Sequence, residues 1–131
     1  MIGVIVVSET KTSVEIVKAL RHILGRKHVK GFASCVLKYG MGVSDMQNLL
    51  KESLEGLGDV SSVVVLSEMF GSTQTQACLK FAKGKGYPVV CGYNLAMLME
   101  ACLVNTSSSL PVFLKKLQNI GKKSVMVCDN E

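Results

Sequence analysis

Residues 2–10 of the chain read IGVIVVSET. The apolar run at residues 2–7 is continuous, and a run of this kind predicts a strand that is buried on both faces. Such strands occur in parallel sheets that carry helices on both sides. The polar residues 8–10 end the run, and apolar residues at helical spacing follow from position 14. A strand, a polar turn and a helix are therefore predicted as the first unit of the fold.

The same unit recurs along the rest of the chain. Further strands are predicted at residues 29–38, 62–66, 87–91 and 124–128. Helices are predicted at residues 12–24, 44–57, 73–83, 95–104 and 110–120. Capping-box patterns are expected to begin three helices, at Thr12, Ser44 and Thr73. Asn94 is expected to cap the fourth helix and Gly121 to end the fifth. This alternation indicates an α/β fold with a mainly parallel sheet and right-handed crossovers.

The composition indicates one folded domain that spans residues 1–131. Hydrophobic residues make up 48% of the chain and charged residues 19%, which excludes intrinsic disorder. The net charge of +5 is spread along the sequence, so a solvated surface is expected and nucleic acid is not an expected partner. The five cysteines form no C-x-x-C pair and are expected to be core thiols. Neither a metal site nor a cofactor is expected.

The sequence also predicts where the protein works. No apolar stretch approaches the roughly eighteen residues that a membrane span needs. The first residues lack the basic segment of a secretion signal. We therefore expect a cytoplasmic protein that does not span the membrane.

Four loops are expected to meet where ligands bind in open α/β sheets, beyond the carboxyl ends of the strands. These are residues 8–11, 39–42, 67–74 and 92–94. In the third loop, Gly71, Ser72 and Thr73 directly precede a helix, where free N–H groups and the helix dipole favour an anion. The alternative is an ordinary strand-to-helix turn with a threonine cap. The chain contains neither the GxxxxGK[ST] phosphate-binding loop nor the G-x-S-x-G nucleophile elbow.

Three stretches of these loops match one family pattern. They are MIGVIVVSETK at residues 1–11, SEMFGSTQTQA at residues 67–77 and GYNLAMLMEA at residues 92–101. Over its whole length the chain resembles the IIA component of the mannose/fructose/sorbose class of the bacterial phosphotransferase system (PTS). The resemblance implies a three-layer open sheet of four parallel strands and a C-terminal antiparallel strand, with helices on both faces. It also implies that the last strand, residues 124–128, is exchanged between the protomers of a homodimer.

The resemblance further implies a phosphoryl carrier. In the family, the protein HPr phosphorylates a histidine after the first strand, and the phosphoryl group then passes to a IIB component and to a sugar. An aspartate at the end of the third strand orients that histidine, and neighbouring Gly/Ser backbone holds the phosphoryl oxygens. Ser8, Phe70, Gly71, Asn94, Leu95 and Met97 match the family pattern.

The chain departs from the family pattern at the reacting positions. Glu9 stands at the histidine position, Thr10 at the following glycine and Glu68 at the aspartate. Ser72, Thr73 and Gln74 replace Gly, Ser and Pro. The remaining histidines, His22 and His28, are expected at the opposite edge of the sheet and cannot substitute. Three interpretations of Glu9 and Glu68 stay open: two hydrated carboxylates, a pair that binds a cation such as Mg²⁺, or Glu9 as a mimic of phosphohistidine.

The sequence thus predicts a degenerate IIA protein, a pseudo-enzyme that acts as a regulatory and protein-binding module. Its partner is expected to be an HPr-like protein, a IIB-like protein or a regulator, bound at the surface around Phe70 and Asn94. A working phosphocarrier is the alternative, phosphorylated at Glu9, Ser8, Ser72 or Thr73. A sensor of a small anion or a metal ion in the same cleft is the third hypothesis.

Overall fold

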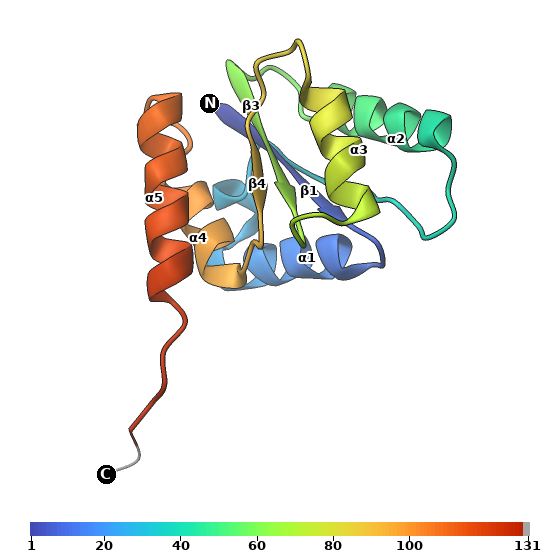
Figure 1. Cartoon of the computed structure of the whole chain (residues 1–131). Helices are drawn as coiled ribbons and strands as arrows, with labels where there is room; N and C mark the ends of the chain where they lie inside the picture. The colour runs from blue at the N-terminus through green and yellow to red at the C-terminus, as the bar shows by residue number, and fades with distance from the viewer. Residues whose placement is uncertain (130–131) are drawn as a thin grey trace.

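Four parallel strands form the centre of the molecule in the computed structural model, which describes residues 1–129. The strands are β1 (Ile2–Ser8), β2 (Phe32–Val36), β3 (Ser62–Ser67) and β4 (Val89–Cys91). The helices are α1 (Thr12–Leu24), α2 (Val43–Gly56), α3 (Thr73–Ala82), α4 (Leu95–Val104) and α5 (Leu110–Lys123), and a short 3₁₀ turn, η1, covers Arg26–His28. The sheet order is β2-β1-β3-β4 (Figure 1). The predicted α/β class is confirmed.

Strand β1 joins the two hydrophobic cores. All seven of its residues are buried. Val4 and Val6 pack into the core on the face that α1, α4 and α5 cover, whereas Ile5 and Val7 pack into the core beneath α2 and α3. A strand with apolar neighbours on both faces needs a continuous apolar run, as residues 2–7 have. The result is the predicted three-layer arrangement, which Figure 1 shows nearly edge-on.

All four strands end at one edge of the sheet because every pair of neighbours is parallel. The register pairs Val6 of β1 with Leu66 of β3, and Ser8 with Val36 of β2. The residues that follow β1 and β3 therefore emerge side by side. We call this side of the molecule the carboxyl edge. Within residues 1–129, no helix is long and apolar enough to cross a membrane.

The helix starts differ from the predicted capping boxes. Helix α1 has Lys11 at its N-cap, whose side chain makes no capping bond, and α2 has Gly42, which has no side chain. The hydroxyl of Ser8, at the end of β1, instead accepts from the Ser13 N–H at 2.9 Å. In α3 the cap is Ser72 and not Thr73. The Ser8 bond reaches α1 from the preceding strand, outside the window of a capping box, whereas the α3 cap lies one residue before the predicted position.

The C-terminal prediction also needs correction. Helix α5 continues through Gly121 to Lys123. Gly121 is a packing residue, since a Cβ placed there would lie 2.7 Å from Met97 Cε. Residues 125–129 form no strand and pair with no strand among residues 1–129. We call residues 125–129 the tail; it leaves the body of the molecule beyond the carboxyl edge (Figure 1). The predicted fifth, antiparallel strand is therefore absent here, because a single segment without a neighbour has no ladder partners.

Candidate functional site

A hydrogen bond between two loops lies at the centre of the carboxyl edge. The backbone N–H of Glu9, after β1, donates to Glu68 Oε1, after β3, at 2.7 Å. Glu68 is half-buried, while the Glu9 side chain is exposed. The two residues follow neighbouring strands, as the sequence predicted, but their contact joins a carboxylate to a backbone amide. A carboxylate acceptor makes this bond charge-assisted and stronger than a bond between neutral groups.

Tyr93, in the loop after β4, contacts the end of β1 close to Glu9. Its hydroxyl donates to the Val7 carbonyl oxygen at 3.1 Å. Burial raises the pKa of Tyr93 well above its ordinary value, and the negative charge of Glu68 raises this pKa further. The phenol therefore remains protonated and continues to donate. Tyr93 was not predicted as a site residue, although its place directly after the fourth strand was a signal.

Ser8 and Thr10 have structural partners within the β1–α1 loop. Ser8 is fully buried, and its hydroxyl lies 2.7 Å from the Ser13 hydroxyl and donates to the Thr10 carbonyl oxygen. The Thr10 hydroxyl lies 3.1 Å from that of Thr12. Ser8 is thus placed to hold the loop together and is inaccessible to an incoming phosphoryl group.

Thr75 organises the β3–α3 loop. Its hydroxyl donates to the Met69 carbonyl oxygen at 2.6 Å and also contacts the hydroxyls of Ser67 and Ser72. The Ser72 hydroxyl accepts from the Thr75 N–H at 3.1 Å, so it is the helix cap. Gly71 adopts a φ of +82°, a conformation that favours glycine. Ser67 and Thr75, which hold this loop from inside, were not predicted as site residues either.

Large apolar side chains are exposed on two loops of the carboxyl edge. Phe70 is 84% exposed and Tyr39 is 89% exposed. Met69, next to Phe70, and Val43, the first residue of α2, are also exposed, and we call Phe70, Tyr39, Met69 and Val43 the apolar rim. The β2–α2 and β3–α3 loops contact each other because Gln74 Nε2 donates to the Leu37 carbonyl oxygen at 3.1 Å. A cavity of about 300 Å³ lies between them, lined in part by Tyr39 and Thr73.

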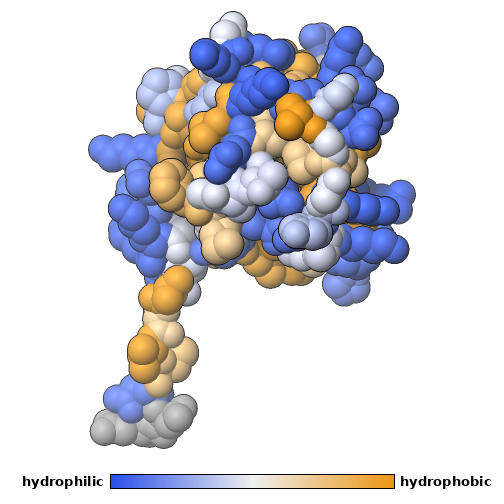
Figure 2. Space-filling model, turned by 45° about the vertical axis from the view of Figure 1, so that its right-hand side comes forward, coloured by the Kyte–Doolittle hydropathy of each residue, from blue (hydrophilic) through white to orange (hydrophobic). Residues whose placement is uncertain are grey.

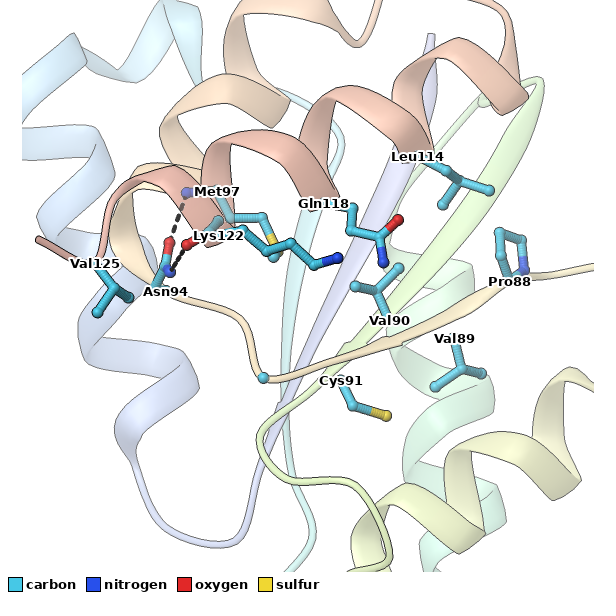
Figure 3. A pocket seen from close by; sticks show the side chains of 12 residues that line it. Pro88, Val89, Val90, Cys91, Asn94, Met97, Leu114, Gln118, Lys122 and Val125 are labelled. Carbon is cyan, nitrogen blue, oxygen red and sulfur yellow. Dashed lines mark hydrogen bonds between the residues drawn. The ribbon is translucent and has the colours of Figure 1, made fainter.

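Asn94 has internal partners. Its side-chain oxygen accepts from the Met97 N–H at 3.0 Å, and its amide nitrogen donates to the Gly121 carbonyl oxygen and to Ser124 Oγ, each at 3.1 Å. The bonds to Met97 and Gly121 are visible in Figure 3. The predicted cap is therefore confirmed, and Asn94 also ties the start of α4 to the end of α5.

A groove of about 530 Å³ separates β4 from α5 (Figure 3). Its apolar lining includes Pro88, Val90, Met97 and Leu114. Gln118 and Lys122 extend from α5 across it in Figure 3. The groove exists because β4 is the edge strand of the sheet and has only β3 as a neighbour.

The histidines lie away from the carboxyl edge. His22 is in the last turn of α1 and His28 is in η1, both at the end of the molecule where the strands begin. In the described part of the chain, no group of three or more His, Cys, Asp or Glu residues could hold a metal ion.

Comparison with known families identifies this arrangement. The sequence model of the family EIIA-man, described as "PTS system fructose IIA component", matches residues 3–118. The chain belongs to this family. The EIIA-man match contains every predicted site residue from Ser8 to Asn94, and it ends before the tail.

Solved structures of IIA proteins share this fold. The mannose/sorbose-specific IIA subunit of Enterococcus faecalis is 26% identical, with a TM-score of 0.83 over 98% of this chain and 96% of that one. A phosphotransferase system EIIA component of Streptococcus agalactiae is 23% identical, with a TM-score of 0.83 over 97% of both chains. A PTS IIA protein associated with the fucose utilization operon of Streptococcus pneumoniae is 18% identical, with a TM-score of 0.78 over 96% and 92%. No curated protein matches the sequence.

Proposed function

We propose that this EIIA-man protein is a silenced phosphocarrier that works as a regulatory, protein-binding module. The observation that carries the proposal is the bond between the Glu9 amide and the Glu68 carboxylate. By the family resemblance, Glu9 stands at the phosphoacceptor position and Glu68 at the position of the orienting aspartate. The Glu68 carboxylate therefore already accepts the hydrogen bond of the backbone amide at the position where the family is phosphorylated.

Charge argues against phosphoryl transfer to this site. A phosphoryl group that approached Glu9 would meet the carboxylates of Glu9 and Glu68 together. Two like charges about 4 Å apart repel by about 1 kcal/mol in water and by about 4 kcal/mol at the effective dielectric of a protein surface. The product would be an acyl phosphate, whereas the family forms a phosphoimidazole. Glu9 instead presents a permanent negative charge where the family carries a transient one.

The apolar rim supports a protein partner. Members of the family work with HPr and IIB proteins, and exposed aromatic side chains such as Phe70 and Tyr39 are typical anchors of protein interfaces. The proposed partner is an HPr-like or IIB-like protein or a regulator. Phe70→Ala should weaken that binding at least tenfold without lowering the melting temperature, because Phe70 is exposed. Leu79→Ala, at an exposed position on α3, is the control. If wild type captures none of these partners, the binding role is wrong.

The central test is intact-mass spectrometry after incubation with phosphoenolpyruvate, Enzyme I and HPr. Wild type should gain no phosphate while HPr is itself phosphorylated. Glu9→His restores the family's acceptor and is run beside it. A phosphate on wild type would contradict the proposal.

A working phosphocarrier is the second candidate function. The exposure of the four possible acceptor side chains leaves two of them accessible to a phosphoryl group. Ser8 is buried, and the Ser72 hydroxyl is used as the helix cap. Glu9 and Thr73 are exposed. A phosphate that is released by hydroxylamine would indicate Glu9, whereas a stable ester would indicate Thr73.

We also propose a homodimer in which the tail of one protomer lies in the groove of the other. Val125, Met126 and Val127 are 82%, 73% and 103% exposed, and Figure 2 shows apolar side chains on the projecting tail. The free edge of β4 offers unpaired backbone groups to an added strand. Light scattering of the wild type should give the molar mass of a dimer. The Val127→Asp variant should give the molar mass of a monomer. A monomeric wild type would reject this arrangement.

A further inference from the structure

A basic cavity lies at the end of the molecule opposite the candidate site. It encloses about 260 Å³ where η1, the N-terminus and the end of α4 meet. Its lining carries Lys27, His28 and Lys30, together with the polar side chains of Asn105 and Thr106. Cys102, Leu103 and Met1 complete the lining, which contains no carboxylate. Nothing in the proposed regulatory role uses this place.

The basic segment is held in a fixed shape. Asn105 is 5% exposed, and its side-chain amide donates to the Lys30 carbonyl oxygen at 3.2 Å. The Asn105 carbonyl oxygen accepts from the Ile2 N–H at 2.9 Å, and Val4 N–H donates to the Gly31 carbonyl oxygen at 2.7 Å. The segment is thus tied to both α4 and β1. The side chains of Lys27, His28 and Lys30 are exposed on this fixed backbone, so a ligand would need to order only those side chains.

The positive charge of the cavity is not neutralised by the protein. No ion pair joins Lys27, His28 or Lys30 to a carboxylate within residues 1–129. The end of α4 contributes at most about half a negative charge from its dipole, which is less than the two full charges of the lysines. Burial raises the pKa of Cys102 to about 11, so this thiol is neutral near pH 7. An excess of positive charge therefore remains.

We propose that this cavity binds a small molecule through a diphosphate or phosphate monoester group. Two ammonium groups, an imidazole and two polar side chains are the donors that phosphate oxygens require. The volume lies just below the usual range for small-molecule pockets, roughly 300–1,000 Å³, so it suits a phosphate group and little more. The rest of the ligand would extend over Leu103, which is 66% exposed.

The test is an NMR titration of the full chain with sodium pyrophosphate at constant ionic strength. The amide signals of Lys27, His28, Lys30, Asn105 and Thr106 should shift and saturate. Lys27→Gln and Lys30→Gln should each weaken binding about fivefold, because each removes one charge-assisted contact. Lys115→Gln removes the same charge from the exposed face of α5 and is the matched control.

Three results would overturn the inference. Shifts that grow without saturation would indicate weak, unspecific association. Equal weakening by all three variants would show that net charge alone attracts the anion. Saturable shifts at Ser72 and Thr73 would place the anion at the carboxyl edge. The titration does not depend on phosphoryl transfer, so its failure and that of the proposed function are distinguishable.

Discussion

The Glu9 amide and the Glu68 carboxylate are joined by a hydrogen bond of 2.7 Å, although 59 positions separate the two residues in the chain. The bond exists because β1 and β3 are adjacent and parallel, so that the loops after them begin side by side. It fixes the β1–α1 loop from the neighbouring strand. Its consequences for stability and for chemistry can be measured separately.

Glu68→Ala should lower the free energy of unfolding by about 1–2 kcal/mol, because it removes a charge-assisted acceptor from a backbone donor. This loss is at the low end of the range for hydrogen bonds to charged groups because Glu68 is only half-buried. Glu68→Gln keeps a neutral acceptor for this bond, so its free energy of unfolding should fall by less than that of Glu68→Ala. Urea denaturation measures both, with Glu55→Ala at an exposed position on α2 as the control. Equal stability of Glu68→Ala and wild type would show that the bond contributes nothing.

The variant Glu9→His combined with Glu68→Asp should accept more phosphate from HPr than Glu9→His alone. Glu68 reaches the backbone amide of position 9, whereas the shorter aspartate is the residue that the family resemblance implies at this position. Intact-mass spectrometry over a time course gives the two initial rates. A rate that is the same in both variants, or higher with Glu68 kept, would show that the length of this side chain does not control the acceptor.

Asn94→Ala should destabilise the protein by about 2 kcal/mol. The substitution removes the α4 cap together with the bonds to Gly121 and Ser124. Asn94→Asp keeps an oxygen that can cap but loses the donor, so about half of the loss is expected. Thermal unfolding tests this, and Asn119→Ala on the exposed face of α5 should have little effect. A loss as large for Asn119→Ala would point to a general sensitivity of α5.

Tyr93 should make stability fall at alkaline pH. Its folded-state pKa is raised above the unfolded value of about 10, so the unfolded chain loses its proton first. The stabilisation is complete below about pH 10 and is lost as the pH rises towards the folded-state pKa. Tyr93→Phe should flatten this decline in urea denaturation between neutral and alkaline pH. Tyr39→Phe, at an exposed position, should decline like wild type, and a decline that Tyr93→Phe leaves unchanged would assign it to buried thiols such as Cys78.

The sequence predicted the elements better than their ends. The apolar run of β1 and the helical periodicity of α1 are local patterns, and both elements form where they were expected. The predicted cap of α1 was wrong because the Ser8 hydroxyl reaches this helix from the preceding strand, outside the four-residue window of a capping box. Gly121 failed as a stop signal because α5 continues through it to Lys123, and Gly121 instead packs against the end of the Met97 side chain on another helix.

The site was predicted as a set of loops and not as a set of contacts. The rule that parallel strands end at one edge placed Ser8, Glu9, Glu68 and Asn94 there. The role of Tyr93 was missed because it acts through a hydrogen bond to the carbonyl group of Val7, 86 positions away in the chain. Thr75 acts within its own loop, on the Met69 carbonyl oxygen, and that contact depends on how the loop folds back. The family resemblance supplied the meaning of positions 9 and 68, which composition and spacing do not contain.

The sequence by itself determined the alternation of strands and helices, the burial of β1 and the family, because hydrophobic period and short motifs are properties of neighbouring residues. The tertiary structure alone decided that Glu68 accepts from Glu9, that Tyr93 donates to Val7, and that Asn94 holds the end of α5. These bonds span 59, 86 and 27 positions. They depend on the strand order β2-β1-β3-β4, which results from packing the two cores together and which no local pattern encodes.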